Sequence, residues 1–285
     1  MKSVKISGSQ EHPRVFLCDN GSLVPDAIQA LGSVAAALGR KVNREVQAVG
    51  LLHSDRAQPV QLGGEPGRVL LSELGKLLSD GEKEFLILPF FLGPSRGVTD
   101  WLPKKLDQLR PKWAEARVRV ARCLASHEDD RLAQAMSEMV RKVVAKEKLE
   151  RPFVAMVDHG TPAREVNEVR ERVGTQLREL LGDEVAGVRT CSMERRPQPA
   201  YDFNEPLLEN LLGDSNAFPS GSVVVSQFFL SPGRHAGPDG DVASICREAE
   251  KARPGLRTFL TKPLGDHPVV LELLAERLQE CLDAC

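Results

Sequence analysis

Residues 226–235 read SQFFLSPGRH, and they directly follow three valines at residues 223–225. Such an apolar run is typical of a buried strand, and the Pro-Gly turn after it presents Arg234 and His235. A second copy lies at residues 90–97, which read FFLGPSRG after another apolar run. The two copies differ at their last position, where Gly97 stands in place of His235. The chain therefore contains a duplicated strand and turn, of which only the second copy keeps a histidine.

Composition narrows the class of protein. The 285 residues carry a formal net charge of -2 with charges well mixed, so we expect no nucleic-acid partner, which would need a basic face. No apolar run approaches membrane-spanning length, and the N-terminus lacks the apolar core of a signal peptide, so we expect no membrane partner and a cytoplasmic location. The six cysteines are scattered without a paired motif, which favours plain thiols.

Strands and helices are predicted to alternate along the whole chain. In the first half we expect strands at residues 14–18, 45–52, 84–92 and 117–124, with helices at 25–39, 68–78, 100–109 and 129–146. In the second half we expect strands at residues 153–157, 187–193, 222–230 and 256–260, with helices at 162–181, 205–212, 241–251 and 268–282. Strands that alternate with helices of this length indicate βαβ units and parallel sheets.

The two halves stay in register over their whole length. Asn20 and His159 are 139 positions apart, and Phe90 and Phe228 are 138 apart. An offset this constant indicates two copies of one α/β unit. We therefore predict an α/β protein of two tandem lobes, residues 12–146 and 151–285, each a parallel four-stranded sheet flanked by helices.

Three residues of the second half are candidates for metal binding and catalysis. In parallel α/β sheets, sites form beyond the carboxyl ends of the strands. His159 and His235 each follow a strand, and Glu194 follows the strand between them, so all three belong at one sheet edge. Two imidazoles and a carboxylate make an open site for a first-row divalent metal. Singly, each has another reading, as a packing histidine or a solvated loop charge.

Two kinds of acidic residue lie beside these candidates. Asp239 and Asp241 follow His235 and rank below Glu194 as the carboxylate of the site. Asp158 precedes His159, and two readings of it are open. It could hold the histidine ring in one tautomer, as partners of metal-binding imidazoles do, or it could stabilise the turn.

Arginines gather around the same predicted edge: Arg164, Arg195, Arg196 and Arg234. For any one of them a solvated surface position is the simpler interpretation. Together they would suit a substrate with several carboxylates, because the guanidinium group grips a carboxylate through two hydrogen bonds.

These motifs resemble those of the class II tetrapyrrole chelatases, above all the sirohydrochlorin chelatases that insert cobalt or iron. The segments that carry the resemblance are DHGT at residues 158–161, FLSPGRH at 229–235, LGDHP at 264–268 and the Glu-Pro pair at 205–206. The resemblance implies a fold of two chelatase-like lobes with a cleft between them. It implies that His159, His235 and Glu194 bind the metal and that one histidine accepts pyrrole protons. The first lobe, with Asn20 and Gly97 at the histidine positions, would be a degenerate copy.

The function that follows is insertion of Co2+ or Fe2+, with Ni2+ as a further candidate, into sirohydrochlorin or a related tetrapyrrole. The metal is then a substrate, and no organic cofactor is expected. Metal insertion needs few, exchangeable ligands and a base for two N–H protons, which imidazoles provide. A non-catalytic metal or tetrapyrrole carrier is the alternative, and a metal-dependent hydrolase is a third reading. The sequence leaves the oligomeric state open.

Overall fold

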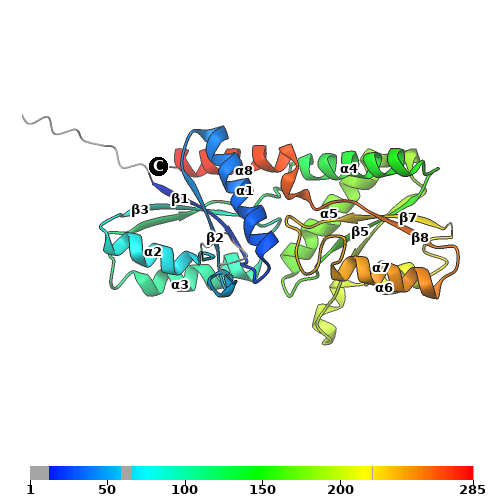
Figure 1. The fold of residues 1–285 in the computed structure, drawn as a ribbon, viewed down its shortest axis with the longest axis horizontal. Coiled ribbons are helices and arrows are strands. Elements are labelled where there is room, and N and C mark those ends of the chain that lie inside the picture. The colour runs from blue at the N-terminus through cyan, green and yellow to red at the C-terminus, as the bar shows by residue number, and fades with distance from the viewer. Residues whose placement is uncertain (1–12, 59–65, 220, 285) are drawn as a thin grey trace, which may run out of the picture.

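The computed structural model describes residues 13–58, 66–219 and 221–284, which form two parallel four-stranded sheets (Figure 1). The first sheet has the order β2-β1-β3-β4 and the second the order β6-β5-β7-β8. The strands of the first are β1 (Arg14–Asp19), β2 (Val46–Gly50), β3 (Glu84–Pro89) and β4 (Arg117–Val120). Those of the second are β5 (Phe153–Asp158), β6 (Gly187–Ser192), β7 (Ser222–Gln227) and β8 (Arg257–Leu260).

A helix follows each strand, as the alternation predicts. The α-helices of the first half are α1 (Pro25–Val42), α2 (Leu70–Ser79), α3 (Leu102–Leu109) and α4 (Arg131–Glu147). Those of the second half are α5 (Arg164–Leu181), α6 (Leu208–Gly213), α7 (Asp241–Ala252) and α8 (Pro268–Asp283). The predicted fold class is confirmed. The helix expected from residue 205 begins later, at Leu208, after the cis bond between Glu205 and Pro206.

Helices cover both faces of each sheet, so the central strands are buried on both sides. Along β7, Val223, Val224 and Val225 have no exposed surface. Alternate residues of this strand belong to different apolar clusters, because successive side chains point to opposite faces. Val224 lies in a cluster that extends through both halves, whereas Val223 and Val225 lie in one confined to the second half.

The last helix of each half packs on the other half's sheet. Figure 1 shows α4 above the second sheet beside α5, and α8 above the first sheet beside α1. The shared cluster contains Met136 and Val140 of α4 together with Val154 of β5. Burying these apolar faces across the halves joins the two lobes into one core. The boundaries at residues 146 and 151 stay a prediction.

No helix among the described residues is both long enough and apolar enough to cross a lipid bilayer.

Candidate active site

The site begins at the turn after β5. Gly160 has a φ of +90°, and a Cβ on it would lie 1.9 Å from the backbone oxygen of Glu194, so only glycine fits here. One carboxylate oxygen of Asp158 accepts hydrogen bonds from the N–H of Gly160 at 3.1 Å and from the hydroxyl of Ser192 at 2.6 Å. The carboxylate of Asp158 therefore stabilises the turn, the second of its two readings.

The turns after β5 and β7 bring the imidazoles of His159 and His235 together. Their ring centroids are 4.5 Å apart with the ring planes at 75°, an edge-to-face arrangement. Both side chains remain partly exposed, at 45% for His159 and 31% for His235. The residues that sequence placed at one sheet edge are thus in contact and open to a ligand.

Each ring makes a hydrogen bond through its Nδ1 atom. Nδ1 of His159 lies 3.0 Å from the backbone oxygen of Gly160, and Nδ1 of His235 lies 2.7 Å from a carboxylate oxygen of Asp241. Since both partners are acceptors, each Nδ1 carries the hydrogen of the neutral ring. In a neutral ring of this tautomer, Nε2 has the lone pair that binds a metal.

Glu194 lies beside His159. Its N–H donates to the backbone oxygen of His159 at 3.2 Å, and its carboxylate comes within 3.6 Å of Nε2 of that ring. Within the described parts of the chain, no group of three or more His, Cys, Asp or Glu side chains could hold a metal ion as the side chains stand. A role for Glu194 as third metal ligand stays a prediction.

Two of the predicted arginines rest on aromatic rings of the segment that follows Glu194. The guanidinium carbon of Arg164 lies 4.7 Å from the ring centre of Phe203, and that of Arg196 lies 5.4 Å from the ring centre of Tyr201. Such stacking occupies the face of the guanidinium group and leaves hydrogen-bond donors at its edge. Both arginines can therefore still bind a carboxylate.

The other two arginines differ from each other. Arg195 donates to Glu205 at 2.6 Å and lies 3.2 Å from Asp202, so its charge is balanced within the segment. Arg234 is 79% exposed, with its Nε 3.8 Å from Asp241. Arg234 is thus free to turn toward a ligand, whereas Arg195 stabilises the segment that carries its neighbours.

A buried arginine beneath the site was missed from the sequence. Arg170 of α5 is 1% exposed, contacts the hydroxyl of Ser192 and donates to the backbone oxygen of Asn204 at 3.2 Å. Its guanidinium group lies 3.6 Å from Asp158. Burial raises the pKa of Asp158, and the charge of Arg170 opposes that rise. The signal for Arg170 was a charged residue on the apolar face of a helix.

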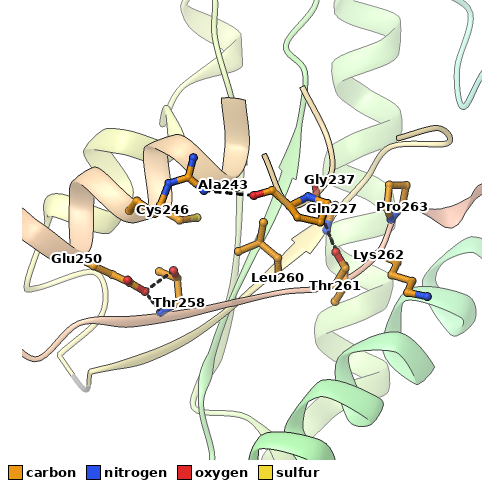
Figure 2. A pocket seen from close by; sticks show the side chains of 12 residues that line it. Gln227, Gly237, Ala243, Cys246, Glu250, Thr258, Leu260, Thr261, Lys262 and Pro263 are labelled. Atoms are coloured by element: carbon orange, nitrogen blue, oxygen red, sulfur yellow. Dashed lines mark hydrogen bonds between the residues drawn. The ribbon is translucent and has the colours of Figure 1, made fainter. Parts of the chain in front are cut away.

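A cavity of about 390 Å³ lies next to the site, between α7 and the end of β8 (Figure 2). Gln227 and Thr261 line it from the sheet, Cys246 lines it from α7, and Gly237 lines it from the loop after His235. Neither histidine of the pair contributes to its wall. The cavity is therefore distinct from the place where the imidazoles meet.

Comparison with known proteins identifies the family. A sequence model of the CbiX family matches this chain twice, at residues 14–143 and 154–281. The chain belongs to the CbiX family. The predicted resemblance to class II chelatases is thereby confirmed, and the double match agrees with the internal repeat.

One curated relative is the chloroplastic sirohydrochlorin ferrochelatase of Arabidopsis thaliana, 31% identical over 130 residues. That match covers 45% of this chain and 52% of the relative, so the chain spans about half the length of the protein it matches.

Solved structures support the fold over nearly the whole chain. SirB from Bacillus subtilis with Fe3+ has a TM-score of 0.66 at 14% identity, and the alignment covers 95% of this chain and 96% of SirB. CbiX, described as the terminal enzyme for siroheme biosynthesis in denitrifying bacteria, has a TM-score of 0.57 at 15% identity and covers 94% of this chain and 99% of its own. At these identities the similarity concerns the fold.

Proposed function

We propose that the chain is a chelatase that inserts Co2+ or Fe2+ into sirohydrochlorin or a close relative. The observation that carries the proposal is the contact between His159 and His235, with Nδ1 of each ring bound to an acceptor. Membership of the CbiX family and the sirohydrochlorin ferrochelatase among its relatives support the choice of substrate.

In the proposed reaction, the divalent metal replaces two pyrrole protons of the macrocycle. Nε2 of His159 and of His235 hold the metal, with the carboxylate of Glu194 as the proposed third ligand. Few protein ligands suit this task, because pyrrole nitrogens must displace them one after another. One imidazole accepts pyrrole protons and passes them to solvent, which reaches both rings because they are partly exposed.

Sirohydrochlorin carries many carboxylates, and the arginines around the site supply the opposite charge. Arg164, Arg196 and Arg234 are the three that we propose to bind it, since their guanidinium groups keep donors available. Arg195 acts indirectly, because its ion pairs with Glu205 and Asp202 hold the segment between β6 and α6 in place.

Anaerobic absorbance spectroscopy tests the function. Sirohydrochlorin in excess is mixed with Co2+, Fe2+ or Ni2+ and the protein, and the rate of metal insertion is compared with the rate without protein. We expect repeated turnover by the wild type, with the metals ranked by rate. His159→Ala and His235→Ala should each lower the rate by about 100-fold or more, since each removes a metal ligand or the base.

The matched control is Asn20→Ala, which truncates the residue at the first half's equivalent of His159 and should leave the rate unchanged. Rates with every metal equal to the uncatalysed rate would overturn the chelatase proposal. Tight macrocycle binding without turnover would favour the carrier instead. We also keep the cytoplasm as the proposed location, although the Arabidopsis relative is by its name chloroplastic.

A further inference from the structure

We propose that Asp241 is the positioning residue of the metal site and that it acts through His235. This inference rests on the proposed function, because it concerns the nitrogen that His235 offers to the metal. From the sequence, Asp241 ranked only as a weaker candidate for direct metal binding. In the structure its carboxylate lies against Nδ1 of His235 at 2.7 Å, a short charge-assisted hydrogen bond.

The backbone is built to hold this pair together. The N–H of Asp241 donates to the backbone oxygen of Arg234 at 3.1 Å, and the N–H of Val242 donates to that of His235, also at 3.1 Å. These bonds close the loop at residues 234–241 on itself and place the first residue of α7 beside the imidazole. A Cβ at Gly240 would lie 2.6 Å from the backbone oxygen of His235, so the loop closes too tightly for a larger residue there.

The hydrogen-bonding capacity of a carboxylate explains how Asp241 acts on His235. A carboxylate can only accept, so Asp241 keeps the hydrogen on Nδ1 and leaves Nε2 of His235 as the metal-binding nitrogen. His159 achieves the same tautomer with a backbone oxygen, that of Gly160, which no substitution of a side chain removes. Asp241 is thus the side chain through which the tautomer of the pair can be changed.

The experiment uses the full-length, metal-free protein with 15N-labelled histidine. Long-range 1H–15N spectra above the imidazole titration range report which ring nitrogen carries the hydrogen, and His235→Gln identifies the signals of His235. Co2+ affinity of the same samples is measured by titration. We expect the Nδ1–H tautomer in the wild type, its loss in Asp241→Asn, and an affinity for Co2+ that is about 10–100-fold weaker in that variant.

Two further variants separate positioning from other effects. Asp239→Asn removes the same charge two residues away, at an exposed side chain, and should match the wild type in both measurements. Asp241→Glu keeps a carboxylate and should recover the Nδ1–H tautomer. Asp241 also begins α7, so thermal melting of each variant measures the separate loss of its favourable interaction with the helix dipole.

A wild-type His235 with its hydrogen on Nε2 would overturn the proposal outright, whether or not Asp241→Asn folds. Retention of the Nδ1–H tautomer in Asp241→Asn would also overturn it, and a weaker Co2+ affinity in that case would make Asp241 a direct ligand. Failure of the proposed function is seen separately, in a wild type that has the Nδ1–H tautomer but neither binds Co2+ nor inserts it.

Discussion

The two halves share the backbone of the site but not its side chains. Gly21 and Gly160 follow the first strand of each half with φ values of +88° and +90°. A Cβ at Gly21 would lie 1.6 Å from the backbone oxygen of Leu52, as one at Gly160 would lie 1.9 Å from that of Glu194. In each half an aspartate accepts a hydrogen bond from the N–H of this glycine. Both halves therefore contain the same turn.

At the three positions that correspond to the proposed ligands, the first half has no histidine and no carboxylate. The N–H of Leu52 donates to the backbone oxygen of Asn20, just as the N–H of Glu194 donates to the backbone oxygen of His159. Leu52 therefore occupies the position that Glu194 has in the second half. In the first half the residues at the positions of the three proposed ligands are Asn20, Leu52 and Gly97. Folding requires the glycine and the aspartate, because they make the turn. It does not require the ligands, so one copy can lose them and keep its fold.

The aspartates that accept from the two turns, Asp19 and Asp158, have different surroundings. Arg170 is the seventh residue of α5, and Leu31 is the seventh residue of α1, where it is buried at 3% exposure. Asp158 therefore has a buried cation beside it, and the matching position beside Asp19 is apolar. Burial raises the pKa of Asp19 to about 6, opposed only by backbone hydrogen bonds.

The largest expected effect on stability comes from removing that cation. Arg170→Leu gives the second half the residue of the first. It removes the cation 3.6 Å from Asp158 and the donor to the Ser192 hydroxyl and the backbone oxygen of Asn204. Breaking a buried ion pair on one side costs about 3–5 kcal/mol, so we expect the free energy of unfolding, measured by urea denaturation, to fall by that amount.

Adding Asp158→Asn to the Arg170→Leu chain tests whether the unpaired charge of Asp158 causes the loss of stability. It removes the unpaired charge but keeps an oxygen for the N–H of Gly160, so the double variant should be more stable than Arg170→Leu alone. A loss below about 1 kcal/mol in Arg170→Leu would mean that the two turns are equivalent and that the arginine is dispensable to the fold.

A smaller effect is expected at the aspartate that has no cation. Because the pKa of Asp19 is about 6 in the folded chain and its ordinary value is 3.8, the folded chain binds this proton more tightly. Its contribution to stability is present at pH 4 and is lost as the pH rises through 6, by at most about 3 kcal/mol. Asp19→Asn cannot ionise, so it should be more stable than the wild type at pH 7.5 and similar at pH 4.

The measurement is the free energy of unfolding across this pH range. Asp26→Asn, at an exposed side chain in the first turn of α1, is the control and should not change the pH dependence. Equal curves for Asp19→Asn and the wild type would show that this carboxyl group ionises normally in the folded chain.

Sequence reasoning reached the repeat and the meeting of the histidines for a physical reason. Strand ends of a parallel sheet share an edge, so the sequence places His159 and His235 at one edge. Their contact follows from the pairing of β5 with β7, which the structure shows. The position of strand ends did not identify Asp241 as the hydrogen-bond partner of His235. Asp241 lies six residues further on, and only the closure of the loop at residues 234–241 returns it to the ring. The sequence favoured Glu194 instead, because Glu194 directly follows a strand and so belongs at the same sheet edge as the histidines.

The exchange of α4 and α8 was beyond the sequence for a different reason. Periodicity shows that each helix has an apolar face, and it does not show which of two similar sheets covers that face. Because the halves are copies, both sheets offer matching surfaces. The role of Arg170 could not be predicted for a similar reason. The groups that pair with it come from β5 and from residue 204, and periodicity does not show which distant residues a helix contacts.

The smallest effect is expected from rebuilding the lost site. In a chain that carries His159→Ala and His235→Ala, only the first half can bind a metal through these positions. A Cβ at Gly97 would lie 3.2 Å from the end of the Leu51 side chain and 3.9 Å from the amide oxygen of Asn20. Leu51 can yield by a few tenths of an ångström, so Asn20→His with Gly97→His should place two imidazoles in reach of one ion.

We expect this chain, with Leu52→Glu added, to bind Co2+ about 10–100-fold more weakly than the wild-type second half, as measured by titration. The reason is that the backbone of the turn is present while the carboxylate that Asp241 provides to His235 is not engineered in. The chain without the three additions is the control and should bind no Co2+ there. An affinity equal to that of the second half would mean that the shared turn suffices to make the site, and that the difference between the halves lies in the three ligand positions alone.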